Sequence, residues 1–142
     1  MSDSPDRHSI AGLSTSQPLF TSLADLLAHY GHTTPEQIAI LAPDRTSLTY
    51  GALWKRTTDI VGELRRFGIA ATDRVAVVLP NGADAAVATV AVASGAVCVP
   101  LHAGFSSGEL RRALQELRVS ALLTSRDLNR RAGVPPTASA CR

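Results

Sequence analysis

Three short apolar runs constrain the fold of this chain more than any other feature of its sequence. They occupy residues 75–79, 97–101 and 121–124, and in each run the apolar residues stand side by side rather than alternating with polar ones. Continuous apolarity indicates strands that are covered on both faces, as in a parallel sheet. The intervals are long enough for crossover helices, so we predict parallel strands joined by right-handed connections.

Helical patterns fill both intervals. Residues 83–94 are mostly small and uncharged, which indicates a closely packed helix. In the second interval, Ser106 and Glu109 have the spacing of a capping box, and apolar residues follow at helical spacing as far as Leu117. The order predicted for residues 74–124 is therefore strand, helix, strand, helix, strand.

A smaller helical and hairpin region precedes this unit. Hydrophobic spacing and turn residues define its elements. We predict a helix from Ser22 to Gly31, a hairpin with strands at 38–42 and 47–50 around a turn at 43–46, and an amphipathic helix from Gly51 to Gly68. The predicted fold class is α/β: a partial three-layer parallel sheet (βαβαβ) preceded by a helix and a small β-hairpin.

The ends of the chain lack such patterns. Residues 1–20 are polar and predict a disordered leader without the apolar run of a secretory signal, and residues 126–142 predict an irregular tail. Residues 85–101 carry no charge, but Gly95 and Pro100 interrupt them and the run is shorter than the roughly 20 residues of a membrane-spanning helix. We therefore expect no membrane association and a cytoplasmic location.

Charge and cysteine content exclude several classes of function. The 14 basic and 12 acidic residues give a net charge of +2, too balanced for a protein that binds nucleic acid or a membrane surface by charge. Cys98 and Cys141 have no partner at metal-binding spacing, so neither a zinc site nor a disulfide framework is predicted. Thirteen of the basic residues are arginine, and Lys55 is the only lysine.

Four segments, in order along the chain, resemble the core motifs of AMP-forming adenylating enzymes. This superfamily comprises acyl-CoA synthetases, aryl-CoA ligases and the adenylation domains of peptide synthetases. The segments are Leu48-Thr-Tyr-Gly-Ala-Leu53, Asp73-Arg-Val-Ala-Val-Val-Leu-Pro-Asn-Gly82, Val92-Ala-Ser-Gly-Ala-Val-Cys-Val-Pro-Leu101, and the Glu109-Leu110 pair with the strand Ala121-Leu-Leu-Thr124. The resemblance runs from Ser22 to Ser125, and it implies that residues 21–125 form part of the N-terminal subdomain of an adenylate-forming domain.

The matching motifs hold residues with structural roles. Thr49 can cap the following helix, although Ala52 stands where the family often has the glutamate that completes a capping box. Tyr50 is expected to pack where the hairpin meets the helix. Gly95 should end a helix and allow it to approach a strand closely, and Pro100 should lie where a strand leaves the sheet.

The resemblance implies a two-step reaction for the parent family. A carboxylate attacks the α-phosphate of ATP to give an acyl-adenylate, and a thiol of coenzyme A or phosphopantetheine then takes the acyl group. In the family, this reaction depends on Mg²⁺ and on three protein features. They are a Ser/Thr/Gly-rich phosphate loop ending in lysine, an acidic residue that holds the ribose, and a lysine in a C-terminal lobe. No such loop leads into a lysine here, and Lys55 falls on the polar face of a helix. We therefore expect no catalytic residue, no bound metal and no cofactor in this chain.

His102 is the weak candidate for a substrate-binding residue, because it follows the carboxyl end of a strand, where open α/β sheets bind ligands. A loop histidine without such a role is the favoured interpretation. The loop from Gly104 to Gly108 could hold an anion at a helix start, but Glu109 lies beside it. His29 and His32 are expected at a helix end, without a role in binding.

Three interpretations of the function remain open. The favoured one is a truncated N-terminal segment of an ATP-dependent, AMP-forming acid–thiol ligase that is inactive alone. The second is a non-catalytic interaction module, or half of a split enzyme that a complementary chain completes. The third is a functionless remnant. The neighbouring coding sequence discriminates among them, because a phosphate-loop motif just downstream would favour a split or interrupted enzyme.

Overall fold

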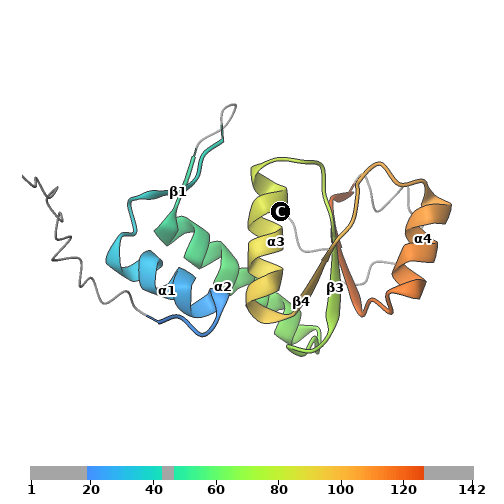
Figure 1. The fold of residues 1–142 in the computed structure, drawn as a ribbon, viewed down its shortest axis with the longest axis horizontal. Coiled ribbons are helices and arrows are strands. Elements are labelled where there is room, and N and C mark those ends of the chain that lie inside the picture. Colours follow the sequence, from blue (N-terminus) through green and yellow to red (C-terminus); the bar gives the residue numbers. More distant parts are fainter. Residues whose placement is uncertain (1–18, 43–46, 127–142) are drawn as a thin grey trace, which may run out of the picture.

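The computed structural model describes residues 19–42 and 47–126, and Figure 1 shows its fold. The predicted turn at 43–46, most of the predicted leader and all but the first residue of the predicted tail lie outside the described residues. The elements in chain order are α1 (Leu23–Thr33), β1 (Ile38–Ile40), β2 (Leu48–Thr49), α2 (Tyr50–Arg66), β3 (Arg74–Val78), α3 (Ala83–Gly95), β4 (Val97–Pro100), α4 (Ser107–Glu116) and β5 (Ala121–Thr124).

The predicted parallel sheet is confirmed. Its three strands have the order β4-β3-β5, and β3 pairs in parallel with both neighbours. Val75 lies opposite Cys98 on one side and Ala121 on the other. The residues of β3 from Val75 to Val78 are all buried, as the continuous apolar run predicted.

Helices cover both faces of this sheet, so the predicted three layers are also confirmed. Successive side chains of a strand point to opposite faces. On one face, Val75, Val77 and Leu123 pack with residues of α2 and α3. On the other face, Ala76 and Leu122 pack with Leu110 of α4. Figure 1 shows α3 and α4 on opposite sides of the sheet.

The N-terminal elements pack on α2. Leu27 of α1, Leu53 of α2 and Val87 of α3 form a separate buried cluster. The ring of Tyr50, at the junction of β2 and α2, lies 5.2 Å from the ring of Tyr30, which agrees with its expected packing role. Phe20 contacts the rings of Tyr30 and His29, so ordered packing begins before residue 21.

The prediction that the first helix ends at Gly31 is wrong, because α1 continues to Thr33. A Cβ atom at Gly31 would lie 2.7 Å from the Cβ of Trp54. The glycine therefore allows α1 to approach α2 closely and does not stop the helix. His29 and His32 consequently lie within the last turns of α1.

Gly95 ends α3 as predicted, but its close neighbour is a helix. A Cβ atom at Gly95 would lie 2.8 Å from Cγ2 of Val61 in α2. We expected this glycine to allow a helix to approach a strand, and that expectation is wrong, because the element it contacts is the helix α2. Close contact between α2 and α3 explains why α3 consists mainly of small residues.

Two of these helices end in the same backbone motif. After α2, Gly68 has φ +77° and donates from its N–H to Arg65, while Ile69 donates to Leu64. After α4, Arg118 has φ +49°, and the equivalent bonds run from Arg118 to Gln115 and from Val119 to Leu114. These pairs of bonds define the Schellman motif, in which glycine is the usual left-handed residue.

Arginines satisfy the carbonyls at the helix ends beside the amino ends of the strands. Arg65 donates from Nη1 to the carbonyl of Ile69 at 2.6 Å and from Nη2 to the carbonyl of Gly95 at 2.8 Å. Arg74 donates to the carbonyl of Leu117 at 3.1 Å. A guanidinium can make such bonds in two directions at once, which links the ends of α2 and α3.

Candidate functional site

The strand order places a switch point at β3. The chain passes from β3 to β4 on one side and then crosses to β5 on the other. In α/β sheets, ligands bind outside the carboxyl ends of the strands at such a reversal. The carboxyl edge, defined here by residues 79–82, 101–106 and 124–126, is therefore the candidate site of this fold.

The structure places His102 at this edge, in the turn that follows β4. Its Nδ1 accepts a hydrogen bond from the backbone N–H of Gly104 at 3.0 Å, and its ring lies 6.1 Å from the ring of Phe105. Because Nδ1 is the acceptor, the neutral ring carries its proton on Nε2. The imidazole therefore holds the turn in the way that an asparagine or aspartate side chain does. The substrate-binding interpretation of His102 stays a prediction.

The glycine-containing loop before α4 is closed by its own capping box. Ser106 Oγ accepts from the N–H of Glu109 at 3.3 Å, and a Glu109 carboxylate oxygen accepts from the N–H of Ser106 at 2.8 Å. The hydrogen bonds from the side chain and then the backbone of Ser106 lower the pKa of Glu109. A carboxylate thus occupies the helix start that the sequence offered as an anion cradle, which argues against that interpretation.

The start of α3 forms another part of the carboxyl edge. Gly82 is its N-cap, has φ +150° and makes no side-chain cap. Nearby in the fold, the buried hydroxyl of Thr124 donates to the carbonyl of Val78 at 2.9 Å, which ties the ends of β5 and β3 together. Thr124 was not singled out from the sequence, because only the strand pairing reveals its partner.

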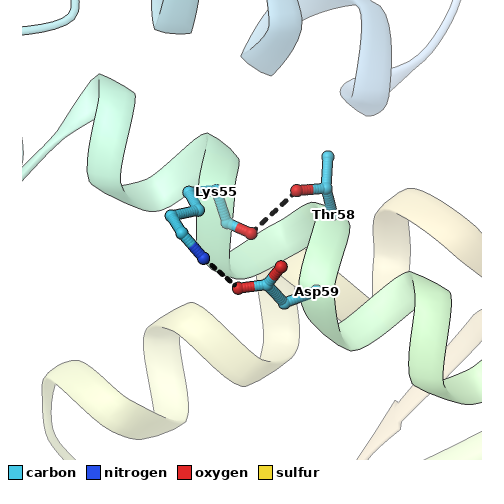
Figure 2. A network of polar contacts seen from close by, with 3 residues as sticks. All are labelled: Lys55, Thr58 and Asp59. Carbon is cyan, nitrogen blue, oxygen red and sulfur yellow. Dashed lines mark hydrogen bonds and ion pairs between the residues drawn. The ribbon is translucent and has the colours of Figure 1, made fainter.

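Lys55 lies away from the sheet on the solvent face of α2, as its pattern predicted. Its ammonium pairs with the carboxylate of Asp59 at 2.7 Å, and the two side chains are 75% and 62% exposed. Thr58 donates to the backbone carbonyl of Lys55 at 2.8 Å, as Figure 2 shows. The pair is a surface ion pair between neighbouring turns of one helix.

Other residues whose side chains could bind or react lie on separate elements. Cys98 lies on β4 with a half-buried thiol, and burial raises its pKa. Trp54 packs against Gly31 in the cluster between α1 and α2. Within residues 19–42 and 47–126, no three histidine, cysteine or carboxylate side chains gather in a way that could hold a metal ion. In the same part of the chain, no helix is both long enough and apolar enough to cross a bilayer.

Comparison with known proteins identifies the class of this fold. The family model described as AMP-binding enzyme matches residues 27–141. The chain therefore belongs to the AMP-binding enzyme family, which confirms the resemblance seen in its motifs.

Curated relatives support this assignment. The chain is 35% identical over 105 residues to acetyl-coenzyme A synthetase 2 of Eremothecium gossypii, covering 70% of this chain and 15% of that protein. It is 32% identical over 123 residues to enterobactin synthase component F of Escherichia coli K12, covering 85% of this chain and 9% of that protein. The chain thus matches only a small part of each relative.

Solved structures share the fold. A nonribosomal peptide synthetase in its α-methyl-L-serine-AMP-bound form superposes with a TM-score of 0.72 at 26% identity, covering 80% of this chain and 13% of that one. A protein described as a long-chain-fatty-acid CoA ligase, from Rhodopseudomonas palustris, superposes with a TM-score of 0.67 at 24% identity, covering 78% and 29%. The second comparison shows the fold alone.

Proposed function

We propose that this chain forms the N-terminal scaffold of an ATP-dependent, AMP-forming acid–thiol ligase and does not catalyse that reaction alone. The observation that carries the proposal is the family match over residues 27–141, combined with the small share of each relative that the chain spans. The parent reaction would use ATP, Mg²⁺ and a thiol of coenzyme A or phosphopantetheine.

The donor groups in the described residues do not fit a bound nucleoside triphosphate with its metal. The single lysine pairs with Asp59 on the outer face of α2. Nδ1 of His102 at the carboxyl edge is engaged in the turn, and the carboxylate of Glu109 in the first turn of α4 is engaged in the helix cap. Phosphate transfer needs positioned cationic donors and a metal to balance developing charge. We therefore derive no chemical step through these groups.

The contribution of this chain is positional. The buried strands β3 and β5 fix the switch point, and the bond from Thr124 to Val78 holds their carboxyl ends in register. The turn from His102 to Gly104 leads directly into the capping box of α4. A reacting group supplied by other parts of an AMP-binding domain would meet a preformed edge here, which favours catalysis because little ordering remains to be done.

Acetate-dependent exchange of pyrophosphate into ATP tests the proposal. The isolated 142-residue chain should show only background exchange. The same chain fused to the remainder of Eremothecium gossypii acetyl-coenzyme A synthetase 2, starting after the aligned region, should exchange above background. A catalytically inactive form of that remainder is the matched control for contaminating ligases. Robust exchange by the purified isolated chain would contradict the proposal, as would a folded fusion without activity.

A further inference from the structure

The turn between β4 and α4 is closed by two hydrogen bonds to a single residue, His102. Its backbone carbonyl accepts from the N–H of Phe105 at 3.3 Å, and Nδ1 of its ring accepts from the N–H of Gly104 at 3.0 Å. A backbone N–H can only donate, so Nδ1 must carry a lone pair and no proton. One of the two bonds that close this turn therefore exists only while the imidazole is neutral.

Gly104 gives the imidazole the space that this bond requires. A Cβ atom at residue 104 would lie 2.5 Å from Cε1 and 2.8 Å from Nδ1 of His102. Among the described glycines, positive φ angles occur at Gly68 and Gly82, so the backbone conformation of residue 104 does not require glycine. The close approach of the ring explains the glycine instead. The ring and the turn are thus fitted to each other.

Proton uptake by His102 is incompatible with the closed turn. Histidine is the side chain that ordinarily changes its charge between about pH 8 and pH 5. A proton on Nδ1 converts the acceptor into a donor, and two N–H groups would then point at each other. The open turn can take up this proton and the closed turn cannot, so a fall in pH shifts the equilibrium toward the open turn.

The charges around this edge do not oppose a proton on His102. Within the described residues, the charged side chains of the elements that begin or end here are Asp84 in the first turn of α3, Glu109 in the first turn of α4 and Arg126 after β5. Two carboxylates against one guanidinium favour a positive charge on the ring. The ring of Phe105, centred 6.1 Å from that of His102, also interacts favourably with a cation.

We propose that the turn from His102 to Phe105 is a proton-sensitive switch at the carboxyl edge. The turn is closed while the imidazole is neutral, and uptake of a proton breaks the bond from Gly104 and opens it. Opening frees the Gly104 N–H and adds a positive charge at the edge where α/β sheets bind ligands. The switch goes beyond the proposed function and does not depend on ligase activity.

The helix start beyond the turn responds to acid separately. The N–H of Ser106 donates to the Glu109 carboxylate at 2.8 Å, and hydrogen bonds from Ser106 hold the pKa of Glu109 below its ordinary value of 4.5. The capping box should therefore stay closed over the range in which histidine titrates. The Ser106 amide reports on this cap, and the Leu101 amide, which donates to Val77 at 2.9 Å, reports on the sheet.

Amide hydrogen exchange of the 142-residue chain between about pH 8 and pH 5 tests the switch, with each rate expressed relative to an unstructured peptide at the same pH. Protection of the Gly104 amide should fall about tenfold on acidification, with the midpoint at which the ring ¹⁵N resonances report protonation of His102. The amides of Leu101 and Ser106 should keep their protection. Unchanged protection of Gly104 while His102 becomes protonated would overturn the proposal. Equal loss at all three amides, or ring ¹⁵N resonances that place a proton on Nδ1 at the alkaline end, would do the same.

His102→Asn separates the acceptor from the titration. The asparagine side chain can accept from the N–H two residues on, as Nδ1 does, but it takes up no proton in this range. Gly104 should therefore remain protected throughout in this variant. His32→Asn is the matched control, because it removes an exposed histidine of α1, beside Trp54, and should leave the response of Gly104 intact. A response that persists in His102→Asn, or disappears in His32→Asn, would assign it to another group and overturn the proposal.

Discussion

Gly95 of α3 and Val61 of α2 lie in direct contact where the two helices pack together. A Cβ atom at Gly95 would lie 2.8 Å from Cγ2 and 2.9 Å from Cγ1 of Val61. The carbonyl of the same glycine accepts a hydrogen bond from Arg65. The position of α3 on the sheet therefore depends on the absence of a side chain at residue 95, and through α3 so does the packing over β3.

Gly95→Ala should lower the free energy of unfolding by about 1–3 kcal/mol, because a packed interface must separate to admit the methyl group. Urea unfolding followed by circular dichroism measures this change. Val61→Ala removes the two atoms that the methyl group would meet, so the double variant should lose less stability than the two single changes added together. Strict additivity would show that the contact does not limit the packing.

Thr57→Val should raise the free energy of unfolding by about 1 kcal/mol. The Thr57 side chain is 1% exposed, and its hydroxyl has no hydrogen-bond partner within residues 19–42 and 47–126. An unsatisfied buried hydroxyl is unfavourable, whereas valine has nearly the same shape. Thr58→Val is the matched control, because the hydroxyl of Thr58 is exposed and bonds to Lys55. Destabilisation by Thr57→Val would point to a partner for this hydroxyl in solution.

Arg118→Gly should stabilise the chain by about 0.5–1 kcal/mol. Arg118 adopts φ +49°, which is unfavourable for a residue with a Cβ atom. The equivalent residue after α2 is Gly68, so Gly68→Ala should destabilise by a similar amount. Thermal unfolding of both variants measures the two effects. An Arg118→Gly variant that melts below the parent chain would show that the arginine side chain contributes more than the strain removes.

Acidification should weaken the start of α4. The folded state holds the pKa of Glu109 below its ordinary value of 4.5, through hydrogen bonds from Ser106. A carboxylate with a lowered folded pKa stabilises fully above its unfolded pKa, and this contribution disappears as pH falls through the folded value. Unfolding free energies measured from pH 7 downwards should therefore decrease below about pH 4.5, and Glu109→Gln should flatten part of this decrease. An unchanged slope in the variant would contradict the prediction.

His102→Ala should loosen the turn after β4, because it removes the acceptor for the N–H of Gly104. We expect the Gly104 amide to exchange with solvent about tenfold faster, which corresponds to loss of one ordinary hydrogen bond. Asparagine can accept the same bond, so His102→Asn should keep the amide protected. Equal exchange in both variants would show that the imidazole does not hold the turn.

The strands could be predicted because every buried position in them favours an apolar side chain. Val75 to Val78 are covered on both faces, so an apolar residue is favoured at every position and the run is visible in the sequence. The order β4-β3-β5 was not predicted, because hydrophobic patterns do not say on which side of β3 each later strand lies.

The errors occur where a distant residue decides the local structure. Glycine is a residue type that often ends a helix, but the close contact of Gly31 with Trp54 explains why a glycine stands at this position. Arg118 ends a helix in a conformation typical of glycine, and nothing in its residue type indicates this. At the candidate site, the position of His102 after a strand was predictable, whereas its bond to Gly104 depends on the rotation of the ring.

Lys55 gives the chain a single amine-bearing side chain, and the structure shows that this side chain is three-quarters exposed. Amine-directed labelling therefore has one side-chain target, with the α-amino group as the other reactive amine. The ion pair with Asp59 lies at the surface, so modification should remove little stability. A fluorophore at this residue would report from a known point on α2. The scarcity of lysine thus allows a single, known position on α2 to be labelled selectively.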